Sequence, residues 1–416
     1  MESRVRVLFM QSQTYFGADS MIHSLLMRYL DRESIEVHVA CNPGSRRNRS
    51  ASITALERIP DLHLLPTVFG PTVNATTKLA VAKATFTGLP PMLVSFARLL
   101  RYIKRHQIDI IDGTEKPRDA FYGLLLARLT GAKMIVHVHA KPGKWMSPLT
   151  RWAMRRADAL IGVSAFVAEV LRVQGYPAAK IHHVLNSLDV GSRDAGAFAV
   201  NADGAAIRQE FQIEAGITLL AVVSRLFPWK GHTQLLEALA RVKETSPAFK
   251  LLIVGEDDPR ATPGGGSYRA DLKKLVQELD LTQHVIFTGF RSDVANIMAA
   301  CDVFAMPSFE EPFGVVYLEA MSMGKPIIGL DKGINGGGGT REVVDNGKGG
   351  LLSAPGDIEQ LARNIATLID DPELRRRMGA YGRMRIEQYF TPTRMADETM
   401  QIYYRILGCP ETQKPS

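Results

Sequence analysis

The sequence predicts an α/β protein of two doubly wound domains, each with a parallel sheet covered by helices. Its 416 residues are enough for two domains of roughly 200 residues each. Short apolar, β-branched segments alternate with longer helix-like segments along nearly the whole chain. The alternation stops once, over residues 187–206, and then starts again. We therefore expect two domains of the same class in succession.

Composition agrees with a globular protein that buries a large core. Hydrophobic residues make up 46% of the chain and charged residues 22%. No apolar run reaches the roughly 18 residues of a membrane span.

The opening MESRVRVLFM has no small-residue cleavage site, so we interpret it as a first strand and not as a signal peptide. Cys41, Cys301 and Cys409 lie far apart and form no disulfide or metal pattern, which predicts a reducing, cytoplasmic location.

The first domain is expected to span residues 1–190. Its expected strands are residues 4–10, 35–41, 109–113, 133–140, 159–164 and 181–186, and its expected helices are residues 20–30, 119–131, 148–157 and 165–175. Residues 46–93 are less regular and rich in Pro, Thr and Gly, with Arg46, Arg47 and Arg49 near their start. We expect this segment to be a mobile loop or an insertion.

The second domain is expected to span residues 207–390, after a linker at 191–206 of small and polar residues. Its expected strands include residues 217–224, 249–255 and 284–289. Its expected helices include residues 232–242, 268–279 and 315–323. The alternation of strand-like and helix-like segments continues in residues 293–300, 302–308, 325–331 and 340–345. Residues 391–416 should form a final helix that packs back toward the first domain. In such folds the ligand crevice lies at the carboxyl ends of the strands, here facing the other domain.

Charge is distributed unevenly between the two halves. Residues 1–200 carry 26 Lys and Arg against 15 Asp and Glu, a net charge of +11, whereas the remainder carries −4. A basic half attracts an anionic lipid surface, a phosphorylated acceptor or a nucleic acid, unless the charge serves solubility alone. No recognition motif or aromatic–basic interleaving supports nucleic acid. We expect weak contact with an anionic membrane and no nucleic-acid partner.

Two acids flank a predicted helix start in SFEEPFGVVYLEAMSMGKP, residues 308–326. Glu311 precedes the helix, Gly314 allows close backbone approach, and the helix should run from about Val315 until Gly324 stops it. Free N–H groups at such a start bind phosphate, and Glu319, within the helix, can accept hydrogen bonds from vicinal hydroxyls of a ribose. The spacing alone is also explained by acids that complement the helix dipole.

Two cations stand in the turn of VSRLFPWKGHTQLLEAL, residues 223–239, between a strand and a helix. Arg225 and Lys230 should lie at the same end of the domain as the helix after Gly314. Such cations can hold a diphosphate and stabilise the charge that grows on it as it departs. Taken alone they would be solvated surface charges, and the nearby acid pair favours the diphosphate.

The chain resembles the retaining GT-B glycosyltransferases of glycosyltransferase family 4. The resemblance is carried by PSFEEPFGVVYLEAMSMGKPIIG, VSRLFPWKG, GGTREVVDNGKGGLL, Asn186-x-x-Asp189 and the terminal YYRIL. The resemblance spans nearly the whole chain. It implies two Rossmann-like domains and transfer of a sugar from a UDP- or GDP-sugar to a hydroxyl acceptor. It also implies that the first domain binds the acceptor and the second the nucleotide sugar.

By resemblance, each candidate residue also has a role. Glu319 would bind the ribose, Arg225 and Lys230 the diphosphate, and Glu311 the transferred sugar. Backbone N–H groups of Gly314 and Val315 would face the distal phosphate. The remaining positions implied for the site are Phe290 and Arg291 beside the base, Glu342 in the donor-sugar pocket, Gly17 in the loop before the first helix, and His139 against the sugar. Phe16 stands where the family often has a first glycine, so that loop departs from the pattern.

Neither a cofactor nor a metal is expected beyond the nucleotide sugar. Asp257 and Asp258 are interpreted as a solvated loop, since no D-x-D pattern occurs. The glycines 336–339 do not match an ATPase P-loop. Two other functions of the same fold remain open, nucleotide-sugar epimerase and sugar phosphorylase. A non-catalytic membrane-surface or nucleic-acid binding protein is the alternative from another class.

Overall fold

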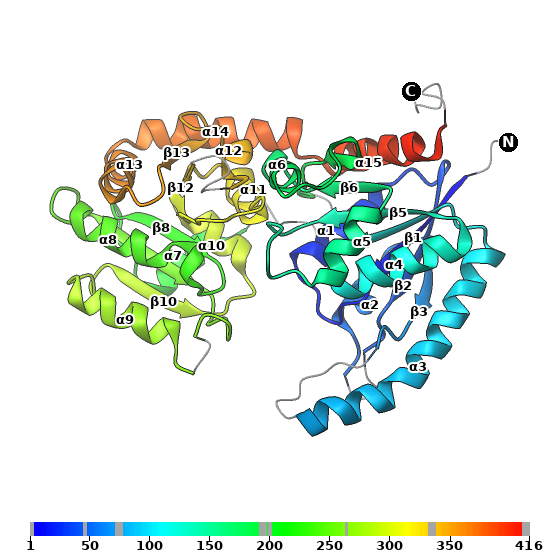
Figure 1. Cartoon of the computed structure of the whole chain (residues 1–416). Coiled ribbons are helices and arrows are strands. Elements are labelled where there is room, and N and C mark those ends of the chain that lie inside the picture. Colours follow the sequence, from blue (N-terminus) through cyan, green and yellow to red (C-terminus); the bar gives the residue numbers. More distant parts are fainter. Residues whose placement is uncertain are drawn as a thin grey trace. The chain divides into compact units, whose positions relative to one another are not determined.

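The computed structural model describes residues 4–44, 48–70, 78–190, 198, 202–262, 265–331 and 338–409, and describes residues 78–87 by their backbone alone. The chain forms two compact units. The first contains residues 1–163, 167–185 and 392–416, and the second contains residues 164–166 and 186–391. Each unit is an α/β layer structure with its own sheet (Figure 1).

The sheet of the first unit has seven strands that pair in parallel. They are β1 (Val5–Gln11), β2 (Ile35–Cys41), β3 (His63–Pro66), β4 (Ile110–Thr114), β5 (Lys133–Val138), β6 (Ala159–Gly162) and β7 (Ile181–His183), in the order β3-β2-β1-β4-β5-β6-β7. Central strands of such sheets are buried on both faces and therefore read as apolar runs. Val7, Leu8 and Phe9 of β1 are completely buried. The order reverses between β1 and β4, which places the topological switch point there.

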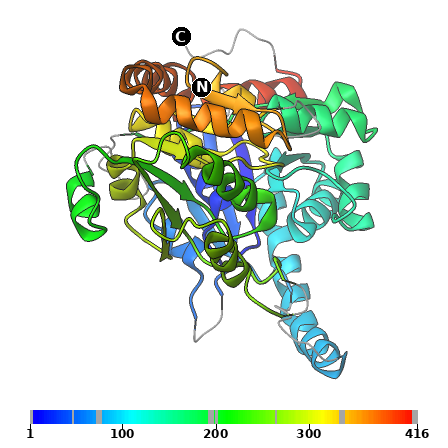
Figure 2. The same cartoon turned by 90° about the vertical axis from the view of Figure 1, so that its left-hand side faces the viewer.

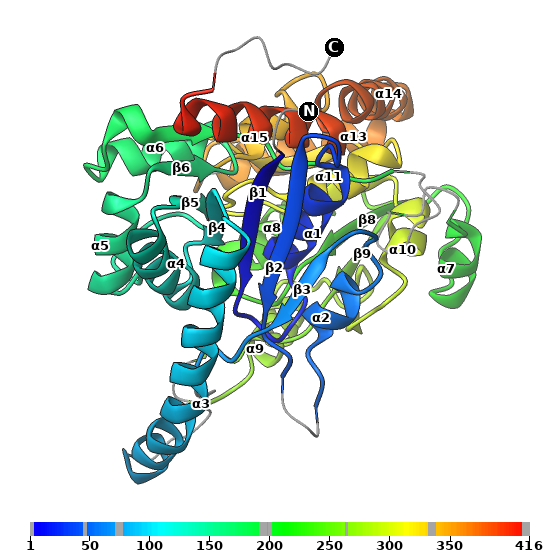
Figure 3. The ribbon, with the colours of Figure 1, turned by 90° about the vertical axis from the view of Figure 1, so that its right-hand side faces the viewer.

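Helices cover both faces of this sheet. They are α1 (Ala18–Tyr29), α2 (Ala51–Leu56), α3 (Lys78–Arg105), α4 (Pro117–Thr130), α5 (Pro148–Arg156), α6 (Ala165–Val173, whose first two residues group with the second unit), η1 (Ala178–Lys180) and α15 (Pro392–Leu407). Figure 3 shows α3, α4 and α5 on one side of the strands and α1 and α2 on the other. The closing helix α15 packs against α1.

The interpretation of residues 46–93 as an irregular loop is wrong for the part that the structure describes. This part contains α2, β3 and the first half of α3, while Arg46 and Arg47 lie outside the described residues. Pro90 and Pro91 lie inside α3, which continues through both. A helix tolerates interior proline when tertiary packing offsets the lost hydrogen bond. Here Leu99 and Ile103, further along α3, are almost fully buried against the unit.

The second unit has a six-stranded sheet whose strands also pair in parallel. They are β8 (Thr218–Val223), β9 (Phe249–Val254), β10 (Val285–Gly289), β11 (Val303–Ala305), β12 (Ile327–Leu330) and β13 (Gly350–Ser353), in the order β10-β9-β8-β11-β12-β13. The order reverses between β8 and β11, which pair through Val303 and Leu220. The switch point of this unit therefore lies between the carboxyl ends of β8 and β11.

Two groups of helices lie on the faces of this sheet (Figures 1 and 2). The unit contains α7 (Gly204–Glu210), η2 (Pro228–Lys230), α8 (His232–Val242), α9 (Tyr268–Glu278), α10 (Val294–Ala300), α11 (Val315–Ser322), α12 (Thr340–Val344), α13 (Ile358–Asp370) and α14 (Pro372–Tyr389). In one group α8 contacts α9 and α13; in the other α10 contacts α7 and α11, and α11 contacts α14. Asp203 caps α7 by accepting hydrogen bonds from two backbone N–H groups, so this helix starts within the segment expected to be a linker.

The predicted fold class, two doubly wound parallel sheets with helices, is confirmed. Among the described residues, none of the helices has both the length and the apolar character that a membrane crossing requires.

Candidate active site

The charged residues that the sequence singled out in the second unit follow the two strands of its switch point. Arg225 and Lys230 come after β8, and Glu311 comes after β11. The backbone brings these two turns together, because Phe309 N–H donates to the Trp229 carbonyl at 2.8 Å. As a result Lys230 Nζ donates to Glu311 Oε2 at 2.6 Å, and both side chains are largely buried.

Gly231 is required for this approach. It has a φ of +80°, and a Cβ at this position would lie 2.0 Å from the Pro307 carbonyl oxygen. Any other residue would separate the turn after β8 from the loop after β11. The glycine therefore holds Lys230 in reach of Glu311.

Arg225 belongs to a second ion pair, which the sequence analysis did not anticipate. Its guanidinium contacts the carboxylate of Asp258, and Arg260 Nη2 donates to the same carboxylate at 2.6 Å. Hydrogen bonds from Arg260, and the Arg225 charge, hold the pKa of Asp258 well below its usual range. Asp257 accepts hydrogen bonds from Ser267 Oγ at 2.5 Å and from Arg269 N–H at 2.7 Å. The interpretation of the two acids as a solvated loop is therefore wrong, because Asp258 is buried and fixes an arginine of the candidate site.

The helix α11 starts at Val315, as the sequence predicted, and ends at Ser322, with Gly324 just beyond. Its N-cap, Gly314, has a φ of +92°, and a Cβ there would lie 2.3 Å from the Tyr317 ring. A glycine is thus needed where the chain turns into the helix. The first N–H groups of α11 follow directly, and they form the kind of helix end that binds anions.

Glu319 lies on α11 and is half-buried. Burial raises the pKa of this carboxyl from 4.5 to about 7. Within the part of the chain that the structure describes, no cation or hydrogen-bond donor pairs with its side chain. Ionisation of Glu319 is thus unfavourable in the free protein, and hydrogen bonds from hydroxyl donors would stabilise the carboxylate.

Two further candidates, Phe290 and Arg291, follow the edge strand β10. Phe290 is 71% exposed directly after β10. Arg291 donates to Glu210 at 2.5 and 2.9 Å and to Asp293 at 2.8 and 2.7 Å. These bonds raise the pKa of Arg291 above its ordinary value. They also fix the position of the segment that follows β10.

Glycines 338 and 339 pack on the loop that carries Glu311. Gly339 N–H donates to the Glu311 carbonyl at 2.8 Å, and a Cβ at Gly338 would lie 1.9 Å from that oxygen. Gly336 and Gly337 lie outside the described residues. Glu342, one turn later, accepts hydrogen bonds at 2.8 Å from the backbone N–H groups of Ala165 and Phe166. Its carboxylate therefore caps the first residues of α6.

The candidates of the first unit, Gly17 and His139, come after β1 and β5, at the carboxyl edge of its sheet. His139 follows β5, and its backbone N–H donates to Glu115 Oε2 at 3.1 Å. Its ring is 5.0 Å from that of His23 on α1, centroid to centroid. Burial, with a contribution from His137, lowers the pKa of His139 to about 3. The imidazole is thus neutral at pH 7, with its Nε2 buried and lacking a hydrogen-bond partner among the described residues.

Buried polar side chains near His139 form a hydrogen-bonded network. His137 Nε2 lies 3.1 Å from Asp112 Oδ2, and the Tyr403 hydroxyl of α15 donates to the same oxygen at 2.6 Å. Gln11, at the end of β1, donates its side-chain amide to His23 Nδ1 at 3.0 Å. No local sequence pattern indicates this network, because its members come from positions far apart in the chain.

Gly17 precedes α1 with extended backbone, at a φ of −108°. This conformation does not require glycine, although a Cβ would lie 3.0 Å from the Tyr15 ring. Asp19, in the first turn, contacts Lys116 Nζ at 3.3 Å. Burial opposes its ionisation, but the Lys116 charge prevails and lowers the pKa of Asp19 to about 2.

Two groups of side chains in the described residues could supply three ligands to a metal ion. They are His23, His137 and His139, and Glu36, His38 and His63, with ligand atoms within 4.8 Å of one another in each group.

Comparisons with known proteins agree with this arrangement. The family described as "Glycosyl transferases group 1" matches residues 203–385, and "Glycosyltransferase Family 4" matches residues 23–191. The chain is 31% identical over 274 residues to the GDP-mannose-dependent monoacylated alpha-(1-6)-phosphatidylinositol monomannoside mannosyltransferase of Corynebacterium glutamicum, covering 63% of this chain and 67% of the relative. It is 29% identical over 308 residues to the 2-deoxystreptamine glucosyltransferase of Streptomyces kanamyceticus, covering 69% and 74% of the two chains.

Solved structures share the fold at lower identity. The Anabaena protein Alr3699/HepE in complex with UDP-glucose matches with a TM-score of 0.73 and 22% identity, over 97% of this chain and 100% of that chain. Sucrose-phosphate synthase of Thermosynechococcus elongatus matches with a TM-score of 0.75 and 20% identity, again over 97% and 100%. The two doubly wound parallel sheets, the charged residues at the switch point of the second unit and these matches identify the chain as a GT-B glycosyltransferase that belongs to glycosyltransferase family 4.

Proposed function

We propose that the protein transfers a hexosyl group from a UDP- or GDP-sugar to a hydroxyl of an acceptor, with retention of anomeric configuration, in bacterial polysaccharide or glycolipid synthesis. The observation that carries the proposal is the pairing of Lys230 Nζ with Glu311 Oε2 at 2.6 Å, at the switch point of the second unit. A cation placed there can bind a diphosphate, and an acid beside it can bind sugar hydroxyls.

The donor is held by groups that complement its parts. Lys230 and Arg225 bind the diphosphate, and the N–H groups of Gly314 and Val315 meet its distal phosphate. Glu319 accepts hydrogen bonds from the ribose hydroxyls. Backbone around residues 290 and 291 lies against the base. The nucleotide sugar is a substrate, and the proposed reaction uses no cofactor.

The transfer needs no protein nucleophile. The bond between the anomeric carbon and the diphosphate oxygen breaks, and the acceptor oxygen bonds to the anomeric carbon from the same face. The acceptor proton passes to the departing phosphate oxygen. Lys230 and Arg225 stabilise the negative charge that grows on the diphosphate, where each preorganised donor contributes a rate factor of about 10² to 10³.

His139 and Glu311 position the transferred sugar. A histidine with a pKa of about 3 is a weak base, so His139 would hydrogen-bond a sugar hydroxyl and would not remove a proton at pH 7. By the family resemblance, Gly17 and Glu342 are also proposed to contribute to donor binding. In the free protein Glu311 neutralises Lys230, and a bound diphosphate would replace it as the partner of the cation.

The acceptor is proposed to be lipid-linked and reached at the inner face of the membrane. The basic first half of the chain supports weak contact with anionic lipid, and relatives in Corynebacterium and Mycobacterium are named for transfer to phosphatidylinositol mannosides. A cytoplasmic, peripheral location fits the free cysteines Cys41 and Cys301, both buried.

Two measurements test the proposal. Thermal-shift screening against nucleotides should show stabilisation by UDP or GDP, which Lys230→Ala and Glu319→Ala reduce. NMR of the product formed from the matching nucleotide sugar and an acceptor should show the anomeric configuration of the donor. An epimer formed from the donor alone, or turnover that depends on inorganic phosphate, would instead indicate an epimerase or a phosphorylase. Normal kinetics in both variants would refute the site.

A further inference from the structure

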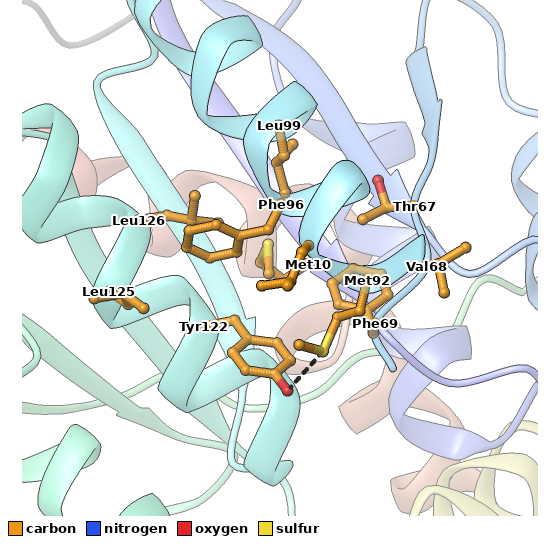
Figure 4. Close-up of a pocket in the computed structure, with 11 residues that line it drawn as sticks. Met10, Thr67, Val68, Phe69, Met92, Phe96, Leu99, Tyr122, Leu125 and Leu126 are labelled. Carbon is orange, nitrogen blue, oxygen red and sulfur yellow. Dashed lines mark hydrogen bonds between the residues drawn. The ribbon is translucent and has the colours of Figure 1, made fainter. Parts of the chain in front are cut away.

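An apolar pocket opens in the first unit between α3 and α4. Figure 4 shows side chains from both helices, from the end of β1 and from the segment after β3 converging on it. Its volume is about 150 Å³, and its lining includes Met10, Val68, Met92, Phe96, Tyr122 and Leu126. An enclosed apolar cavity of this size holds a group as large as benzene, so this pocket has room for a short stretch of an apolar ligand.

The polar atoms at the pocket do not favour a polar ligand. The Tyr122 hydroxyl lies 3.4 Å from the thioether sulfur of Met92, a weak acceptor. The mouth is also apolar, since Leu93 and Leu125 line the pocket and are 56% and 41% exposed. Val94, the neighbour of Leu93 on α3, is 51% exposed. Exposed apolar side chains clustered around a pocket mark a binding surface.

The helices around the pocket are basic and carry almost no exposed acid. Residues 78–157 contain 15 Lys and Arg and only four acids, Asp109, Asp112, Glu115 and Asp119. The last three are at most 1% exposed, and Asp109 accepts a hydrogen bond from the backbone N–H of Arg6. This stretch has the same net charge, +11, as the whole of residues 1–200.

The basic residues are interleaved with exposed apolar ones. Arg98 and Arg101 are exposed on α3, one and two turns after Val94. On α5, Trp152 is 43% exposed, and the Arg156 guanidinium lies 4.5 Å above its ring. Tryptophan and arginine together are typical of surfaces that meet the headgroup region of a bilayer. In Figures 1 and 3 the first part of α3 extends away from the sheet.

We propose that this pocket binds the end of an alkyl chain of an anionic lipid, whose phosphate is bound by the exposed basic residues of α3. The apolar pocket and the cationic rim fit the two parts of such a molecule. The inference rests on the proposed function in one respect. The bound lipid is the acceptor only if the protein is the proposed glycosyltransferase. Met10 lines the pocket, and its neighbour Gln11 holds His23 beside His139. The pocket therefore lies at the carboxyl edge of the sheet, the edge that also carries His139.

Vesicle sedimentation of the full chain tests the binding. Vesicles of phosphatidylglycerol and phosphatidylcholine in equal parts should pellet the protein, and vesicles of phosphatidylcholine alone should pellet much less. A phosphatidylglycerol with a diazirine at the end of one acyl chain should crosslink to residues of α3 or α4, as located by mass spectrometry. Crosslinks elsewhere, or pelleting without crosslinks to these helices, would refute the pocket.

Leu93→Glu places a charge at the mouth without disturbing the core and should weaken vesicle binding about tenfold. Val173→Glu makes the same change at a 68% exposed position on α6 and should bind as the parent does. Removing the charges of Arg98 and Arg101 together should weaken binding by roughly thirty-fold. Equal binding by Leu93→Glu and the parent would overturn the proposal.

Nucleotide binding separates this inference from the proposed function. Leu93→Glu should retain the thermal shift caused by UDP or GDP while losing lipid binding. If lipid binds at the pocket but no nucleotide stabilises the protein, the donor assignment fails and the lipid site stands. If nucleotide binds but lipid does not, the lipid site fails alone.

Discussion

Glu319→Gln is the most informative single change in the second unit. Glutamine keeps the shape of the side chain but has no charge. Burial raises the pKa of Glu319 to about 7, and no cation in the described residues compensates for its ionisation. The substitution therefore removes an electrostatic cost and, at the same time, an acceptor for ribose hydroxyls.

The magnitude follows from the pKa. An unfolded chain ionises Glu319 above pH 4.5, whereas the folded protein keeps it protonated until about pH 7. The unfolded state thus binds fewer protons in this range, and Glu319 lowers stability as the pH rises from 4.5 to 7. The full difference corresponds to about 3 kcal/mol, and because the residue is only half-buried we expect about 1–2 kcal/mol. For a unit of this size that is a shift in Tm of about 2–8 °C.

Thermal unfolding at pH 5 and pH 8 provides the assay. Glu319→Gln should have nearly the parent Tm at pH 5 and a higher Tm at pH 8. Hydroxyl donors favour the ionised carboxylate, so stabilisation of the parent by nucleotide should increase as the pH rises through 7. In the variant this stabilisation should be weaker and should not depend on pH in this range. A Tm difference that is the same at both pH values would refute the reasoning.

Three further predictions concern the turns around the donor. Lys230→Ala should lower kcat by about 10² to 10³ with a smaller effect on KM, measured by release of nucleoside diphosphate; a change in KM alone would contradict its role. Asp258→Asn should weaken nucleotide binding by about tenfold in calorimetry, because the arginines that it holds lose their anchor, and unchanged affinity would show that they need none. Gly231→Ala should destabilise the protein by more than about 2 kcal/mol, because the new Cβ would clash with the Pro307 carbonyl. Gly216→Ala, also at positive φ but in open space, is the matched control and should cost less.

Parts of the fold were predictable because their signals are local. The apolar run of β8 and the amphipathic pattern of α8 depend only on neighbouring residues, and the turn into α11 is encoded by Gly314. The helix α3 was missed because Pro90 and Pro91 argue against a helix locally. Burial of Leu99 and Ile103 against the rest of the unit outweighs that local preference.

The candidate site likewise has features that the sequence predicts and features that only the tertiary structure shows. The sequence singled out Lys230 and Glu311 as separate members of two motifs, 81 positions apart, and the structure joins them in one hydrogen bond. Asp258 gave no usable signal, because an acid in a glycine-rich loop looks solvated until a guanidinium is placed beside it.

Outside residues 46–93 the sequence alone determined most of the order of strands and helices. It also determined the doubly wound class and the residue types of the candidate donor site, because periodicity and turn chemistry act over a few residues. Tertiary structure decided which of the charges become neighbours, how deeply Glu319 and His139 are buried and therefore where they titrate, and that apolar side chains of α3 and α4 surround a pocket. These properties depend on distances between segments far apart in the chain, and on the water that packing excludes, and neither is written in any local pattern.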